Sequence, residues 1–262
     1  MKKRLLALLL VLNLLLACCV FTSCKELTSV VELTQAIENT NALDEMDATL
    51  ELEMEIGILE TDFAISAVAD IKAKGLQGED PVYYSKIQTE DTTLLSGNME
   101  MYKEGHLAYL VVGDLKYKTR ADSVPAQYDF SDDVRDVLEE LPEDLLKGVE
   151  FTENQDGSKT ISVLVEEEVF VDLYEDLLED AGAPVGNLLN NVAIEDAVVS
   201  ITIKDGFVLE YALNFTVAII NSGFEDYESF VSYKVTYNNP GEPVEITPPE
   251  GYQDFEALPF GG

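Results

Sequence analysis

Beyond residue 24 the chain contains no cysteine. Its three cysteines, Cys18, Cys19 and Cys24, all lie at the end of an N-terminal apolar run. Histidine is nearly absent too, because His106 is the only one. A lone imidazole without thiol ligands lacks the partners that zinc binding or imidazole catalysis requires. The sequence therefore predicts no metal site and no cofactor.

Basic residues are also scarce, with 16 lysines and arginines against 51 acidic residues and a formal net charge of −35. Without residues 1–23, which hold Lys2, Lys3 and Arg4 but no acid, 13 basic residues remain and the net charge is −38. Such a chain is repelled by nucleic acid and by anionic lipid headgroups. We interpret the acidity as a solvated surface, and the alternative is a surface that collects cations or basic partners.

Sequence motifs for catalysis are lacking. The chain has no Gly-rich phosphate loop, no nucleophile elbow and no zinc-ligand spacing. Thr152 to Val163 can be aligned with a calcium loop, but its first and twelfth positions are Thr152 and Val163, where the ion needs carboxylates. We expect a hairpin turn there instead, and a protein that is not an enzyme.

The N-terminus has the layout of an export signal. Three basic residues precede an apolar run from Leu5 to Ala17, which only Asn13 interrupts. A lipoprotein signal ends in small residues before a cysteine that becomes acylated. Cys24 follows Thr22 and Ser23, and cleavage there leaves no spare thiol.

We therefore expect a signal peptide over residues 1–23 and a single domain over 24–262, held by its Cys24 acyl group on the extracytoplasmic face of a bacterial cell membrane. Cys18, after Leu15-Leu16-Ala17, is the alternative acylation site.

Alternation of apolar and polar residues predicts long antiparallel strands with one dry face. The clearest runs are Leu50 to Ile56, Phe63 to Ile71, Met99 to Met101, Leu107 to Val111, Val199 to Ile203, Phe207 to Ile219 and Val231 to Tyr237. Turns are expected at Lys103-Glu104-Gly105, Gly113-Asp114, Asn154-Gln155-Asp156-Gly157 and Lys204-Asp205-Gly206. This spacing predicts antiparallel meanders.

Apolar residues at helical spacing predict a few helices between these strands. One begins near Ser29, where Glu32 completes a capping-box spacing, and ends near Asn41. Others are expected over residues 131–145 and 170–178. The predicted fold is α+β, a long and strongly curved sheet wrapped around these helices, because the apolar face of the sheet must be covered.

The chain resembles the LolA/LolB and LppX/LprG group of envelope lipoprotein-like domains. The likeness is carried by the hairpin Met99 to Tyr109, by its counterpart Ile203 to Val208, and by the closing strand and Pro-bounded tail from Tyr237 to Pro249. It covers most of the chain after Cys24. The resemblance implies a half-barrel whose concave face can hold acyl chains, and it supplies no catalytic residues.

From the alternation we expect seven side chains to line such a concave site: Met54, Phe63, Met99, Met101, Tyr109, Leu213 and Phe215. Methionine suits an adaptable lipid-binding wall, although a packed core uses the same residues. We thus expect a membrane-anchored protein that binds or carries a lipid or other hydrophobic ligand. The alternative is an envelope structural or interaction module with a packed core and an acidic working surface.

Overall fold

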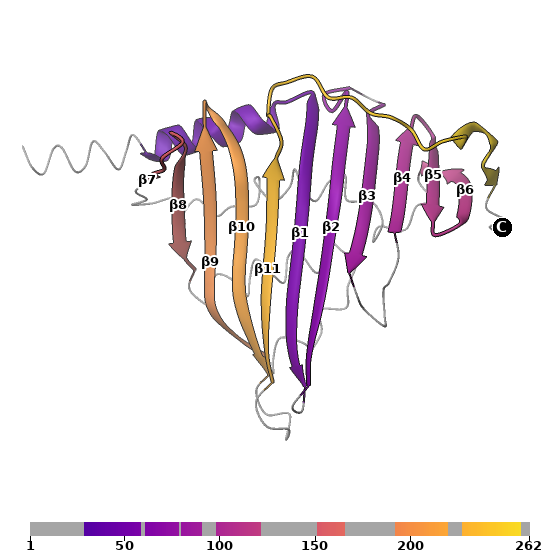
Figure 1. The fold of residues 1–262 in the computed structure, drawn as a ribbon. Helices are drawn as coiled ribbons and strands as arrows, with labels where there is room; N and C mark the ends of the chain where they lie inside the picture. The colour runs from indigo at the N-terminus through magenta and orange to yellow at the C-terminus, as the bar shows by residue number, and fades with distance from the viewer. Residues whose placement is uncertain are drawn as a thin grey trace, which may run out of the picture.

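The computed structural model describes residues 29–58, 61–78, 80–90, 98–121, 151–165, 192–219 and 227–257. Within these ranges 12 strands form one sheet in the order β12-β6-β5-β4-β3-β2-β1-β11-β10-β9-β8-β7. The sheet is curved and does not close on itself (Figure 1). The predicted half-barrel is confirmed. The helices predicted over 131–145 and 170–178 lie outside the described residues.

Two antiparallel meanders build this sheet. The first comprises β1 (Glu45–Ile58), β2 (Thr61–Lys74), β3 (Val82–Glu90), β4 (Asn98–Glu104), β5 (Leu107–Val112) and β6 (Leu115–Arg120). The second comprises β7 (Thr152–Glu153), β8 (Lys159–Leu164), β9 (Val192–Lys204), β10 (Phe207–Ile219) and β11 (Tyr227–Tyr237). Pairing of β1 with β11, from Ala48 opposite Tyr237 to Ile56 opposite Ser229, joins the two meanders at the centre.

Tight turns connect successive strands where the sequence predicts them. In the β9–β10 turn, Asp205 and Gly206 have φ of 52° and 83°. Two successive positive φ values are typical of the type I′ turn, whose twist matches that of the flanking strands. Strand β10 has the bounds that the alternation predicts, whereas β3 and the short β12 (Glu256–Ala257) are strands that we did not predict.

The N-terminal helix, residues 29–41, lies across the ends of the second meander (Figure 1). Its Leu33 and Ala36 are fully buried in the main core. Thr40 fixes its end, because Thr40 Oγ1 donates to the Ala36 carbonyl at 2.8 Å and accepts the Val208 N–H at 2.9 Å. Val31, in contrast, is 59% exposed on the opposite side of the helix.

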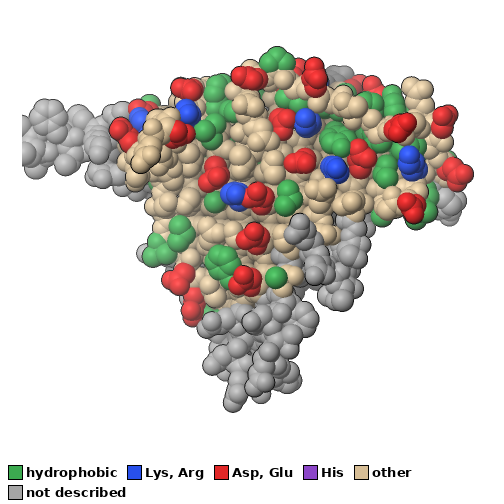
Figure 2. All heavy atoms as spheres, in the orientation of Figure 1, with side chains coloured by type: hydrophobic (Ala, Val, Ile, Leu, Met, Phe, Trp, Pro, Cys, Tyr) green, Lys and Arg blue, Asp and Glu red, His purple; other side chains and the backbone are tan. Residues whose placement is uncertain are grey.

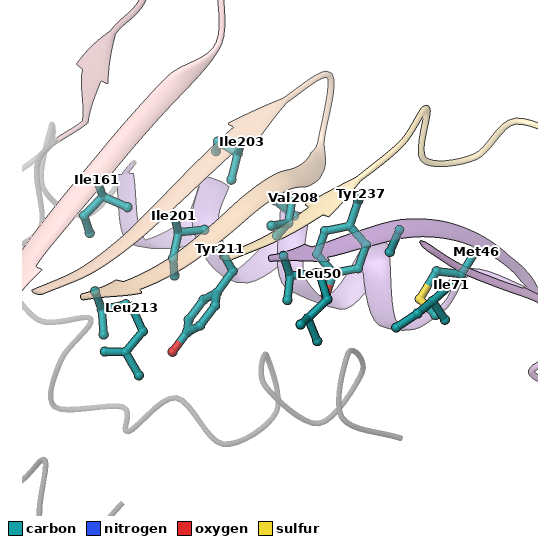
Figure 3. Close-up of a cluster of buried hydrophobic side chains, with 14 of the residues drawn as sticks. Met46, Leu50, Ile71, Ile161, Ile201, Ile203, Val208, Tyr211, Leu213 and Tyr237 are labelled. Carbon is teal, nitrogen blue, oxygen red and sulfur yellow. The ribbon is translucent and has the colours of Figure 1, made fainter. Parts of the chain in front are cut away.

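The helix covers one face of the sheet, which we call the inner face. Figure 3 shows side chains of this face, including Leu50, Ile71 and Tyr211, packed as one cluster. The other, outer face carries Glu51 and Glu53, and Figure 2 shows acidic side chains spread over it with a few lysines between them.

After β11 the chain crosses the outer face as a C-terminal strap, residues 238–257. It contains η4 (Tyr252–Asp254) and ends in β12, which pairs in parallel with β6. Figure 1 shows the strap, in yellow, running along one end of the sheet from β11 to β6. The Pro-rich tail is thus part of the fold.

Candidate functional site

Three predicted lining residues meet on the inner face where the two meanders join. The register places Met54 of β1 opposite Val231 of β11, which in turn lies opposite Phe215 of β10. The next row contains Leu52, Tyr233 and Leu213. Because neighbouring strands are about 4.8 Å apart, each row spans roughly 10 Å.

Met99 and Met101 lie on the same face, farther along the sheet. One row connects Leu50, Ala69, Ile87 and Met99, and the next connects Ala48, Ile71, Ser85 and Met101. Met99 is 9% exposed and Met101 is 1% exposed. The apolar part of the inner face therefore extends from β10 across the central strands to Met99 and Met101 of β4.

Tyr109 does not share this face, which corrects our expectation. It lies opposite Tyr102, whereas Met101 lies opposite Leu110, so Tyr109 and Met101 are on opposite faces of the sheet. Phe63 of β2 pairs with Ile56 near the β1–β2 connection.

Tyr109 belongs instead to an aromatic cluster on the outer face. The Tyr102 and Tyr109 rings lie 5.3 Å and 4.9 Å from the ring of Tyr252, and Phe255 lies 6.2 Å from Tyr109. Burial, then a hydrogen bond to Glu104, raises the pKa of Tyr102 to about 12. These contacts attach the strap to β4 and β5.

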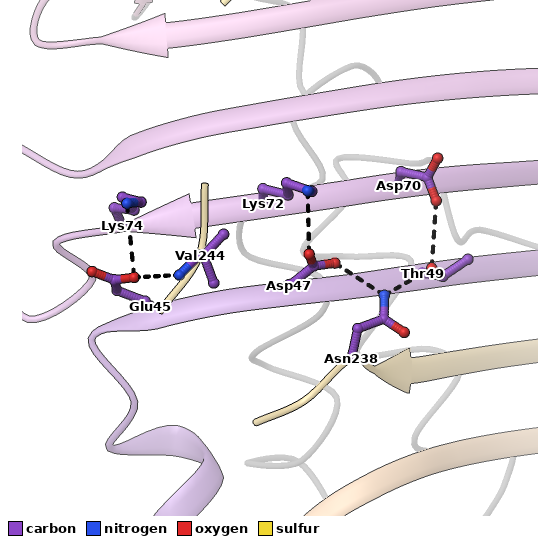
Figure 4. A network of polar contacts seen from close by, with 8 residues as sticks. All are labelled: Glu45, Asp47, Thr49, Asp70, Lys72, Lys74, Asn238 and Val244. Atoms are coloured by element: carbon purple, nitrogen blue, oxygen red, sulfur yellow. Dashed lines mark hydrogen bonds and ion pairs between the residues drawn. The ribbon is translucent and has the colours of Figure 1, made fainter. Parts of the chain in front are cut away.

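Polar contacts hold the first part of the strap against β1 (Figure 4). The Val244 N–H donates to Glu45 Oε2 at 2.6 Å, and Asn238 Nδ2 donates to Asp47 Oδ1 at 3.0 Å and to Thr49 Oγ1 at 3.1 Å. Lys72 pairs with Asp47 at 3.3 Å. The outer-face carboxylates of Glu45 and Asp47 are thus bonded to the strap.

The segment that aligns with a calcium loop is a closed hairpin turn. Asp156 Oδ1 accepts from the Ser158 N–H and hydroxyl, and Lys204 Nζ lies 3.3 Å from Asp156 Oδ2. The Ser158 bonds, followed by Lys204, lower the pKa of Asp156 to about 2. His106 is exposed in the β4–β5 turn. Among the described residues no three His, Cys, Asp or Glu side chains group to hold a metal.

Ser85 is an inner-face residue that the sequence did not single out. Its hydroxyl is buried and, within the described part of the chain, is the one buried side-chain polar atom without a hydrogen-bond partner. The sequence feature that could have identified Ser85 is a serine among the inward-facing apolar positions of β3. We did not predict that strand.

Cys24 and Cys18 lie outside the described residues. No helix in the described ranges is long and apolar enough to cross a membrane.

No protein-family model and no curated protein sequence matches the chain. Among solved structures it is similar to LprF from Mycobacterium bovis, with a TM-score of 0.45, 12% identity, and coverage of 85% of this chain and 97% of that one. It is also similar to a LolA superfamily protein from Nitrosomonas europaea, with a TM-score of 0.25, 8% identity, and coverage of 80% and 94%. A DUF1329 family protein from Desulfovibrio piger has a TM-score of 0.27 and 9% identity, with coverage of 80% and 93%.

Proposed function

We propose that this protein binds a lipid or another hydrophobic ligand against the inner face of its sheet, without catalysis. The observation that supports the proposal is the extent of that face. Its apolar surface continues past the residues that the N-terminal helix covers, and several of its side chains are only partly buried. They are Leu52, Met54, Val163, Val217 and Tyr233. Ligand sites in proteins are concave and mostly apolar, as such a face would be.

The proposal places the protein in the cell envelope. Residues 24–262 form the mature domain, and an acyl group on Cys24, or alternatively on Cys18, attaches it to the outer leaflet of the cell membrane. With a net charge of −38 after removal of residues 1–23, the surface of the protein does not attract anionic lipids. The acyl group therefore supplies the attachment, and the inner face stays available for a ligand.

A second candidate function has its own supporting observation. Leu213 is 8% exposed and Phe215 is 6% exposed, as in an ordinary packed core. If the whole inner face is filled by the protein itself, the protein is an interaction module of the envelope whose acidic outer face meets its partners.

Phe215→Ala separates these two functions. Full-length protein is purified from the envelope, and its bound lipid is measured by native mass spectrometry as mass beyond the covalent anchor. For a binding protein we expect added mass in the wild type, a severalfold smaller bound fraction in Phe215→Ala, and little change in melting temperature. Phe230→Ala is the matched control, because Phe230 is 42% exposed on the same pair of strands.

A packed core gives the opposite result. Truncating a buried phenylalanine leaves a cavity that costs about 3 to 5 kcal/mol of unfolding free energy. No added mass in the wild type, together with a loss of that size in Phe215→Ala, would reject the binding function and leave the interaction module.

A further inference from the structure

The hydroxyl of Ser85 differs from the other buried hydroxyl groups of the described residues. Ser85 is 3% exposed, close to Thr40 at 6% and Ser158 at 4%. Thr40 bonds to two backbone groups, and the Ser158 hydroxyl donates to Asp156 at 2.7 Å. Ser85 Oγ has no such partner. Buried polar groups are nearly always hydrogen-bonded, because an unbonded one has lost its water without compensation.

Ser85 lies within the apolar face on which the proposed function depends. On β3 it lies directly opposite Ile71 of β2 and Met101 of β4. Its diagonal neighbours on β2 are Ala69 and Ala73, whose side chains are single methyl groups. The hydroxyl thus lies among apolar side chains, with Ile71 and two alanines on β2 and the flexible Met101 on β4. The charged residue of this face closest in register is Lys103, a diagonal neighbour on β4, whose Nζ lies over the Tyr83 ring at 5.1 Å from its centroid.

We propose that Ser85 is the polar contact of the ligand site and donates its hydrogen bond to the neutral carbonyl oxygen of an acyl ester. This inference rests on the proposed binding function and specifies its ligand class. A charged headgroup does not fit at this point, because a buried charge needs a counter-ion and the directly opposite residues, Ile71 and Met101, carry none. The diagonal Lys103 lies over the Tyr83 ring instead. A pure hydrocarbon would leave the hydroxyl unbonded. An ester carbonyl satisfies it while the acyl chain stays on the apolar face.

Two probes of equal chain length test the inference, methyl palmitate and octadecane. Detergent-purified full-length protein is incubated with both together and repurified, and the bound ester and alkane are extracted and quantified. One hydrogen bond corresponds to about 1 kcal/mol, or a five- to tenfold change in affinity. We expect Ser85→Ala to lower the ratio of bound ester to bound alkane about five- to tenfold.

Control variants show whether the change is specific. Ser162→Ala removes a hydroxyl from the outer face, where it bonds to Ser200 at 2.7 Å, and should leave the ratio unchanged. Ser85→Cys keeps the size of the side chain but donates weakly, so it should lower the ratio as Ser85→Ala does. The ligand-free Ser85→Ala protein should melt at the same temperature as the wild type or higher, because it loses an unbonded polar group.

Each other outcome has a distinct meaning. Equal ratios in the wild type and both Ser85 variants overturn the role of Ser85 and leave the binding function standing. Binding of neither probe to the wild type rejects the binding function itself. A clearly lower melting temperature in ligand-free Ser85→Ala shows that the hydroxyl serves the fold, and it also overturns the inference.

Discussion

The two ends of the described chain cover opposite faces of one sheet in different ways. The N-terminal helix covers the inner face with apolar side chains, and Leu33 and Ala36 are completely buried in the main core. The C-terminal strap crosses the outer face through hydrogen bonds to β1 and then through the aromatic cluster at β4 and β5. Its last strand, β12, pairs with β6 through only two residues.

This difference indicates two levels of stability. The helix shares its core with β1, β2 and β8 to β11, so its loss exposes the centre of the sheet. The strap closes a separate small core around Tyr102, Tyr109 and Phe255. Regions with few buried contacts can open without global unfolding. We therefore expect the strap to open locally while the helix unfolds with the whole domain.

Leu33→Ala should have the largest effect, because it removes a fully buried side chain between the helix and the sheet. Truncating a buried leucine costs about 2 to 5 kcal/mol. The measurement is the free energy of unfolding in urea, which should fall in one cooperative transition. Val31→Ala on the same helix is the control, and its 59% exposed side chain should contribute less than about 0.5 kcal/mol. Similar losses in the two variants would contradict the position of the helix.

Phe255→Ala should have a smaller and local effect. Phe255 is 4% exposed and contacts Tyr109, while Lys116 Nζ lies 5.6 Å from its ring centroid. We expect the strap to lose about 1 to 3 kcal/mol of docking free energy, because its core is small. Hydrogen exchange should accelerate at β6 and β12, and the main core should keep its protection. Equal acceleration at Val235, in the centre of the sheet, would show that the strap and the main core under the N-terminal helix unfold together.

Much of the fold could be predicted because most long strands are apolar on one face only. In β1 the odd positions from Glu51 to Glu55 are acidic and the even positions are apolar, so the inner face is unambiguous. In β10 the alternation sets the inner face from Tyr211 to Phe215, and its register brings Phe215 beside Val231 and Met54. Before Glu210 a bulge shifts the register, so that Val208 and not Leu209 joins the main core. These strands therefore carry the lining residues, Met54 and Phe215, that the sequence correctly predicted to share one face of the sheet.

The rest could not be predicted because some strands are apolar on both faces. In β5, Ala108 and Leu110 face inward while Tyr109 faces outward, and all three are buried. The strap that covers Tyr109 comes from the other end of the sequence, so the pattern of β5 alone cannot show it. In β3, Tyr83 and Tyr84 lie on opposite faces and Ser85 interrupts the inward apolar positions, which hides the alternation.

The smallest effect expected at neutral pH concerns the phenol of Tyr102 under the strap. Burial raises the pKa of Tyr102 from 10 to about 12, so the folded protein retains a proton that the unfolded chain releases near pH 10. The contribution of Tyr102 to stability is therefore complete below pH 10 and is lost as the pH rises through about 12. We expect the strap to open more often as the pH rises across this window. Hydrogen exchange at β12 measures this opening.

Tyr102→Phe tests this expectation because it keeps the ring and removes the ionisable group. The chain has 12 tyrosines, so the absorbance of ionised phenol is compared between wild type and variant, and the difference should titrate near pH 12. Strap exchange in Tyr102→Phe should depend less on pH between 10 and 12. Tyr117→Phe, on the opposite face of the sheet, should keep the wild-type dependence. A difference signal centred at pH 10 would mean that the phenol of Tyr102 is in contact with water. The strap would then not exclude water from the aromatic cluster on the outer face.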